Sequence, residues 1–216
     1  AAIDPDQNPK DLEAFLDALN DKVEISQDIV VLPGMVADSL EAASPFENVH
    51  DKLLIDATSI VPTDPRSPDE PLEGSYNQPT PEWRQHGKAS PPFEGLEAVE
   101  ALDGVRQARM LRPNMLVVST TIEGTPSPRT GQHDGDDTQE AQRIEQIIQL
   151  RNSIWQLDSE KNLRWLFITN DDLDMTHTKA RRRLLWQLTA RFDVGRGLTF
   201  DEGRDRLCWD ATTPIP

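Results

Sequence analysis

The hydrophobic positions near the start of the chain predict an amphipathic helix. Leucine and phenylalanine recur between positions 12 and 19 at the i, i+3, i+4, i+7 spacing of one helix face. Asn8 is expected to be the N-cap and Pro9 the first helical residue, because these residue types favour those positions. Asp11 and Glu13 place negative charge near the positive end of the helix dipole, so charge and hydrophobic pattern agree.

Two short apolar runs follow and predict strands. The run from Ile29 to Leu32 is apolar at every position, a pattern typical of a strand that is covered on both faces. Pro33-Gly34 is expected to end this strand. A second strand is expected from Leu53 to Ile55, and Asp56-Ala57-Thr58 follows it. These elements predict a first αβ unit over residues 1–60.

The pattern changes in residues 61–95, where eight prolines occur. Proline fixes φ and removes a backbone donor, so no regular helix or strand can continue through this segment. The segment is therefore expected to be an extended, proline-rich connector between two folded units.

Residues 96–216 predict a second αβ unit in which strands and helices alternate. A short helix is expected near 96, and a long helix begins at Asp137, where Glu140 completes a start that resembles a capping box. Arg151 shares the apolar face of the long helix, and its head is expected to reach a carboxylate. The other expectations are a buried stripe of Ile144, Ile147, Ile148, Ile154 and Trp155, a helix at 177–189, and strands at 105–111, 115–120, 163–169, 197–200 and 207–209.

The alternation of strands and helices predicts an α/β fold with a mostly parallel sheet and flanking helices. Both units also end alike: Lys52 to Thr58 and Arg206 to Thr212 each contain a basic residue, a short apolar strand and Asp-Ala-Thr. Because a recurring pattern of this kind indicates an internal repeat, we interpret the two units as related. The residues assigned to the shared structural motif are Asp56, Thr58, Asp210 and Thr212.

Composition narrows the classes of partner and compartment. The formal net charge of −16 argues against nucleic acid, whose phosphates require clustered Lys and Arg. No apolar run reaches the roughly 18 residues of a membrane span, and no signal peptide is visible. A single cysteine, Cys208, excludes an internal disulfide and fits a reducing compartment, so a cytoplasmic location is expected. The chain begins without Met inside a motif, which suggests a domain of a longer protein.

The sharpest candidate for chemistry is an acidic cluster after the strand expected at 163–169. Asp171, Asp172 and Asp174 would lie at the carboxyl end of that strand, where adjacent carboxylates suit a hard cation such as Mg²⁺. The segment resembles the first motif of haloacid-dehalogenase-type phosphatases, with Asp172 as nucleophile and Asp174 as acid/base. The remaining motifs of that family are missing downstream. The competing interpretation is that these side chains cap the next helix and bind turn amides.

Other catalytic patterns are not found in the sequence. The four histidines lie far apart and lack metal-type spacing, and no glycine-rich phosphate loop or serine nucleophile elbow occurs. We therefore assign no catalytic residue, no cofactor-binding residue and no firm metal ligand to this chain.

Taken in order, these motifs resemble the C-terminal region of UbiD-type decarboxylases. The first segment resembles the branch of the family that acts in the menaquinone pathway. One departure is that Arg191 to Gly197 lacks the proline and the final Asp of the family pattern Arg-x-Asp-Pro-x-Arg-Asp. The matching stretches are Asp4-Pro5-Asp6, Asp28 to Val31, Ala43-Ser44-Pro45, Lys52 to Thr58, Leu116 to Ser119, Leu166 to Ile168, Asp171 to Asp174, Trp186 with Arg191 to Asp193, and Asp210 to Pro214.

The resemblance implies a supporting role. The family decarboxylates aromatic or unsaturated acids with prenylated FMN, a divalent metal and a Glu-Arg-Glu set that belong to other domains. No position here matches that set, so the parent enzyme would hold the cofactor and this chain would act as a scaffold or oligomerisation region.

Partners are expected to be a second copy of the chain or other domains of the parent decarboxylase. The first unit lacks the strand that should precede Asp4, so its sheet edge is expected to recruit another strand. The second alternative, besides the phosphatase, is an acidic interaction module that binds a basic partner through the −16 charge.

Overall fold

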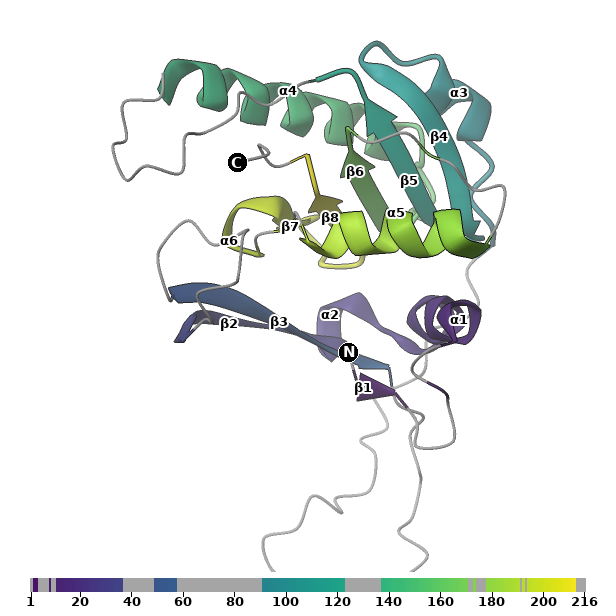
Figure 1. Cartoon of the computed structure of the whole chain (residues 1–216). Coiled ribbons are helices and arrows are strands. Elements are labelled where there is room, and N and C mark those ends of the chain that lie inside the picture. Colours follow the sequence, from purple (N-terminus) through teal and green to yellow (C-terminus); the bar gives the residue numbers. More distant parts are fainter. Residues whose placement is uncertain are drawn as a thin grey trace, which may run out of the picture.

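The computed structural model describes two α/β units that pack against each other (Figure 1). Thr58, Asp171, Asp172, Asp174 and residues 61–90 of the proline-rich connector lie outside the described residues. Residues 2–3, 8, 11–36, 49–57, 91–122, 137–170, 173, 178–190, 192 and 194–212 are described.

The first unit contains a three-stranded sheet with the order β1-β3-β2. β1 runs parallel to β3, whereas β2 and β3 form an antiparallel pair. β1 supplies the strand before Asp4 that we expected to be missing, so that expectation is wrong, although this strand is only two residues long. The elements are β1 (Ala2–Ile3), α1 (Leu12–Lys22), α2 (Ile25–Asp28), β2 (Ile29–Val36) and β3 (Val49–Ala57).

The second unit contains a five-stranded sheet with the order β4-β5-β6-β8-β7. Its three central strands, β5, β6 and β8, are parallel, and one antiparallel strand lies at each edge. The predicted α/β class with a mostly parallel sheet and flanking helices is therefore confirmed. The elements are α3 (Leu96–Glu100), β4 (Val105–Arg112), β5 (Met115–Thr120), α4 (Asp137–Gln156), β6 (Trp165–Thr169), α5 (Thr178–Ala190), α6 (Val194–Gly197), β7 (Leu198–Phe200) and β8 (Leu207–Asp210).

The relation between the units extends to strand order and register. β1-α1-α2-β2-β3 and β6-α5-α6-β7-β8 have the same element order, the same sheet order and the same strand directions. When Asp56 is matched to Asp210, four cross-strand pairs of the first unit correspond to pairs of the second unit without a shift in register. The equivalent pairs are Ala2–Asp56 with Ile168–Asp210, Ile29–Ile55 with Leu198–Trp209, Val30–Leu54 with Thr199–Cys208, and Val31–Leu53 with Phe200–Leu207.

Two hydrophobic cores hold these layers together. The first core lies between the two sheets and joins Leu16 and Leu19 of α1 to Leu184 and Leu188 of α5. The second core lies on the far side of the larger sheet, beneath α3 and α4 (Figure 1). Because the first core draws on both units, neither unit buries its apolar face without the other.

Two local expectations for the first unit are corrected. The N-cap of α1 is Asp11 rather than Asn8, and its carboxylate accepts hydrogen bonds from the backbone N–H groups of Glu13 and Ala14. β2 continues through Pro33-Gly34 with a shift in register. Gly34 allows this with a φ of 64°, and its N–H donates to Asp51 at 2.9 Å.

The buried face of α4 also differs from the expected stripe. Ile147 and Ile154 are buried as predicted, but Ile144 is 40% exposed. The guanidinium of Arg151 donates to the side-chain oxygen of Asn152 and lies over the Trp155 ring, and it reaches no carboxylate of the residues that the structure describes. The residues that α4 buries are Arg143, Ile147, Leu150 and Ile154, which follow the i, i+4, i+7, i+11 spacing of one helix face.

Candidate functional site

The Asp-Ala-Thr motif of the second unit forms a closed polar turn at the end of β8. One carboxylate oxygen of Asp210 accepts hydrogen bonds from the Thr212 N–H at 2.8 Å and the Thr212 hydroxyl at 2.5 Å. Ala211 is fully buried, and its N–H donates to Ile168 of β6 at 2.8 Å. The contacts explain each residue type. The short carboxylate of Asp210 closes the turn, and the methyl group of Ala211 fills space in the core. The hydroxyl of Thr212 donates to that carboxylate.

Arg143 of α4 connects this turn to the helix that covers it. Its guanidinium donates to the Thr212 hydroxyl oxygen at 2.5 Å and lies 3.6 Å from the second oxygen of Asp210. All three side chains are largely shielded from water, which strengthens a charged contact of this kind. The motif therefore fixes α4 on the sheet.

The first unit repeats part of this arrangement. Asp56 pairs with Ala2 of β1 as Asp210 pairs with Ile168, and Ala57 is fully buried like Ala211. Asp210 and Thr212 contact each other and Arg143, and their assignment to a shared structural motif stays a prediction. For the first unit the comparison ends at Ala57, because Thr58 lies outside the described residues.

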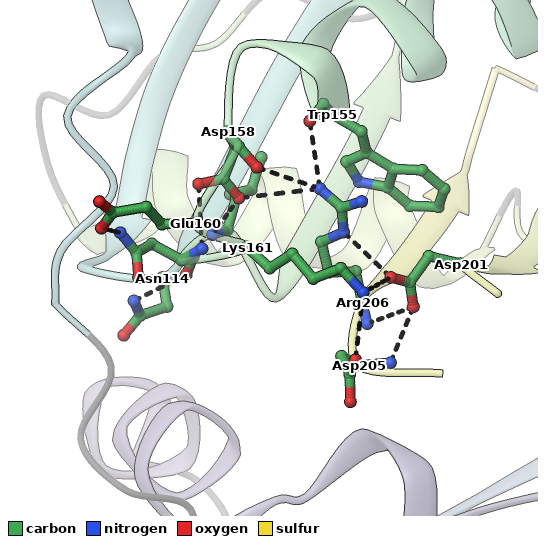
Figure 2. A network of polar contacts seen from close by, with 10 residues as sticks. Asn114, Trp155, Asp158, Glu160, Lys161, Asp201, Asp205 and Arg206 are labelled. Carbon is green, nitrogen blue, oxygen red and sulfur yellow. Dashed lines mark hydrogen bonds and ion pairs between the residues drawn. The ribbon is translucent and has the colours of Figure 1, made fainter. Parts of the chain in front are cut away.

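The basic residue of the shared ending, Arg206, belongs to a second polar network (Figure 2). Its guanidinium lies over the Trp155 ring, 5.0 Å from the centroid, and donates to the Trp155 carbonyl at 3.2 Å. It also donates to Asp201 at 3.3 Å, and Asp158 lies on its other side (Figure 2). Arg206 thereby ties the C-terminal end of α4 to the hairpin between β7 and β8.

Lys161 and Asp201 are the titratable pair of this network (Figure 2). Burial alone would raise the pKa of Asp201, but the backbone N–H of Arg206 and the Lys161 ammonium stabilise its charged form. The pKa of Asp201 is therefore lowered from its ordinary value. Hydrogen bonds to Asp201 and Asp205 raise the pKa of Lys161. Both shifts favour charged groups that hold the hairpin and do not prepare either residue for proton transfer.

Arg164 joins the two units at the C-terminal end of α1. Its guanidinium donates to the carbonyl of Asn20 at 3.2 Å and to the carbonyl of Val23. These carbonyls belong to the end of the helix, where acceptors lack intrahelical partners and positive charge is favourable. Burial lowers the pKa of Arg164, a sign that this cation has lost most of its hydration.

Two further arginines of the second unit contact the first turns of α1. Arg112, at the end of β4, donates to Glu13 at 2.9 Å and to Asp17. Arg181 of α5 lies 2.9 Å from Glu13. Burial alone would lower the pKa of Arg112, but these two carboxylates raise it overall. Arg181 therefore helps to stabilise the contact between the units.

The glycine at position 197 of the second unit has a steric explanation. When the two units are aligned by strand register, Gly197 corresponds to Asp28. Gly197 lies just before β7, and Asp28 lies just before β2. Asp28 is buried and accepts a hydrogen bond from the Glu24 N–H at 2.8 Å. A Cβ at Gly197 would lie 2.5 Å from the Asp210 carbonyl oxygen and 3.0 Å from the Phe192 ring, so no side chain fits there.

The predicted acidic cluster lies in a segment of which only Leu173 is described. Leu173 is buried in the core between the sheets, and its N–H donates to the side-chain oxygen of Gln107 at 3.1 Å. The described residues contain no group of three His, Cys, Asp or Glu side chains that could hold a metal. Asp171, Asp172 and Asp174 lie outside that search, and their binding of a cation stays a prediction.

Cys208 is a packed core residue. It is 2% exposed, and burial raises the pKa of its thiol, so the thiolate that nucleophilic attack requires is disfavoured. Sequence reasoning assigned no catalytic role to this thiol. It missed Arg143, Arg164 and Arg112, although an arginine on the apolar face of a helix or beside an apolar strand is the signal that could have identified them.

Comparison with known proteins finds a family match for the first of the two units. Residues 1–57 match the family model described as the 3-octaprenyl-4-hydroxybenzoate carboxy-lyase C-terminal domain. This segment is similar to the C-terminal region of UbiD-type decarboxylases. The match covers about a quarter of the 216 residues. No curated protein and no solved structure matches the chain.

The match and the internal repeat complement each other. The family model covers the unit whose elements are β1 to β3, and the second unit repeats their order and register without being matched. In the part of the chain that the structure describes, no helix has the length and hydropathy needed to cross a bilayer.

Proposed function

We propose that this chain is a C-terminal, non-catalytic region of a UbiD-like decarboxylase that acts on aromatic or unsaturated carboxylic acids. The observation that carries the proposal is the match of residues 1–57 to the carboxy-lyase C-terminal domain. The repeat of the same unit at 165–212 supports a scaffold role, because the second copy is used for packing and its polar groups hold helices and hairpins in place.

The proposal assigns the chemistry to other residues of the decarboxylase. Prenylated FMN and a divalent metal, where the decarboxylase uses them, would bind outside this chain, and no reaction step is given to its side chains. The charged groups described above are paired with one another at the ends of helices and strands, which suits support rather than turnover. A cytoplasmic location is part of the proposal and is supported by the buried Cys208, the single cysteine of the chain, which forms no disulfide within it.

The decisive test is release of CO2 from a panel of aryl and α,β-unsaturated carboxylic acids. The full-length gene product, loaded with prenylated FMN and a divalent metal, is expected to release CO2, whereas the 216-residue chain alone is not. Release by the chain alone would contradict the non-catalytic role. Failure of the loaded full-length protein on the whole panel would contradict the family assignment.

The two rival functions have tests of their own. Magnesium-dependent hydrolysis of p-nitrophenyl phosphate that is lost in Asp172→Asn would establish the phosphatase instead. If the chain captures a basic protein in a salt-sensitive manner and the full-length protein releases no CO2, the acidic interaction module would be favoured. Association of the chain, as a homo-oligomer or with other domains, is also proposed, and a monomer at every concentration in sedimentation would count against self-association.

A further inference from the structure

The outer face of the smaller sheet carries apolar side chains that are exposed. Val30 and Leu32 of β2 are 44% and 39% exposed, and Leu54 of β3 is 50% exposed. Val30 pairs with Leu54 across the two strands, so these side chains share one face. The opposite face, with Ile29 and Ile55, is buried in the core between the sheets. We call the exposed set Val30, Leu32 and Leu54 the outer patch.

The second unit shows what covers the same face in its own copy. When the two units are aligned by strand register, Val30 corresponds to Thr199 and Leu54 corresponds to Cys208. Cys208 is 2% exposed and packs in the core beneath α4. α4 and α3 lie on this side of the larger sheet (Figure 1), whereas the patch side of β2 and β3 faces away from the second unit.

The sequence of β2 independently indicates a covered face. Its run from Ile29 to Leu32 is apolar at every position, which is typical of strands buried on both sides. The structure buries Ile29 and leaves its neighbours Val30 and Leu32 exposed. A strand with solvent on one face normally alternates apolar with polar residues, and this strand does not.

The charges that flank the patch fit a helix placed as α4 is placed. In the second unit the C-terminal end of α4 contacts Arg206, and Arg143 of the same helix contacts Asp210. The register counterparts are Lys52 and Asp56, which lie two residues to either side of Leu54 on the same face. Lys52 is exposed and would face the negative end of a helix dipole, and Asp56 would face a basic side chain.

We propose that the outer patch is the docking site of an amphipathic helix that belongs to the parent decarboxylase. The helix presents aliphatic side chains at the i, i+4, i+7 spacing of α4, directs its C-terminal end towards Lys52 and places an arginine or lysine beside Asp56. This inference rests on the proposed function for the source of the helix. It adds the site on this chain, the chemistry of the occupant and its orientation.

Thiol labelling can test whether the patch is covered. Leu54→Cys places a reactive thiol on the patch, and Gln146→Cys places one on the exposed side of α4 as a control. The native Cys208 is buried and is expected to remain unlabelled. In the 216-residue chain both introduced thiols should react at similar rates. In the full-length decarboxylase, labelling at position 54 should be at least about tenfold slower while labelling at 146 is unchanged.

Cross-linking identifies the occupant. A short photoreactive linker on the position 54 thiol should attach to a peptide with aliphatic residues at helical spacing and a basic residue at one end. Equal labelling at 54 in the chain and in the full-length protein overturns the proposal. Protection in the isolated chain that increases with its concentration also overturns it, because a second copy would then be the occupant.

The outcome is separable from that of the proposed function. CO2 release with an unprotected position 54 would retain the decarboxylase and reject the docking site. Absence of CO2 release with position 54 protected by a helix would retain the docking site and reject the decarboxylase as its source.

Discussion

The two units share one folding pattern but differ in what lies on the outer face of the sheet. In the second unit, α4 covers Leu166, Ile168 and Cys208 with Ile147, Leu150 and Ile154. In the first unit, Leu54 occupies the position equivalent to Cys208 and is 50% exposed, and its cross-strand neighbour Val30 is 44% exposed. The same local sequence pattern therefore specifies strand order and register in both units, whereas covering of the second face depends on an additional segment.

The inner faces of the two sheets, by contrast, pack into one core, so the two units depend on each other for stability. Leu16 and Leu19 of α1 and Leu184 and Leu188 of α5 belong to one core. Arg164, Arg112 and Arg181 then bind α1 from the second unit. The two copies thus stabilise each other on one face, and among the described residues only the second copy has a helix that covers the other face.

The largest effect is expected when the same charge is placed at the two equivalent positions. Cys208→Asp would bury an unpaired carboxylate beneath α4 and is expected to lower the free energy of unfolding by about 3–5 kcal/mol. Leu54→Asp is expected to change it by no more than about 0.5 kcal/mol, because that side chain is half exposed. Urea unfolding of both variants measures the difference. If Cys208→Asp does not fold, Cys208→Ser still allows the comparison, and equal losses would show that the faces do not differ.

A smaller effect is expected from breaking the connection at the end of α1. Arg164→Met removes two charged hydrogen bonds to the carbonyls of Asn20 and Val23 and is expected to cost about 2–3 kcal/mol. Arg109→Met is the matched control. Its guanidinium forms an exposed pair with Glu100 at 2.8 Å, and its loss should cost less than about 1 kcal/mol. Equal unfolding midpoints for the two variants would show that Arg164 does not stabilise the contact between the units.

The contact between α4 and the Asp-Ala-Thr turn should contribute somewhat less. Arg143→Met leaves the Asp210 carboxylate without its cation and is expected to cost about 2 kcal/mol. Arg151→Met on the same helix should cost less than about 1 kcal/mol, since that guanidinium contacts Asn152 and the Trp155 ring at the surface. Thermal unfolding followed by circular dichroism separates the variants, and a smaller loss for Arg143→Met than for Arg151→Met would contradict this role.

The smallest effect concerns pH. Because the pKa of Asp201 is lowered on folding, its carboxylate stabilises the fold above its ordinary pKa of 3.8, and this stability is lost as the pH falls through the lower folded value. Between pH 5 and pH 2 the wild type should therefore lose up to about 1 kcal/mol more than Asp201→Asn. Urea unfolding across this range measures it, and parallel pH profiles would contradict the shift.

Local patterns predicted the elements well because hydrophobic periodicity decides them. The strands at 115–120 and 207–209 and the helix at 137 correspond to observed elements. The N-cap was misplaced because Asn8 and Asp11 are both good caps, and only the three-dimensional course of the chain selects between them.

Long-range contacts could not be predicted in the same way. Nothing in the sequence near Arg164 indicates that its partners are carbonyls at Asn20 and Val23, far away along the chain. The candidate structural motif was identified from its repetition, but its partner Arg143 was not, because Ile144 and Arg151 appeared to lie on the buried face. A small rotation of α4 about its axis separates the expected stripe from the observed one.

The central claim is that residues 2–57 and 165–212 are two copies of one folding pattern in the same register. Nuclear Overhauser contacts between backbone protons of facing strands in the isotope-labelled chain test it most directly. The account predicts contacts for Val30 with Leu54 and for Thr199 with Cys208, together with Ala2 beside Asp56 and Ile168 beside Asp210. A pairing shifted by even one residue in either unit would place Leu54 and Cys208 on different faces and contradict the claim.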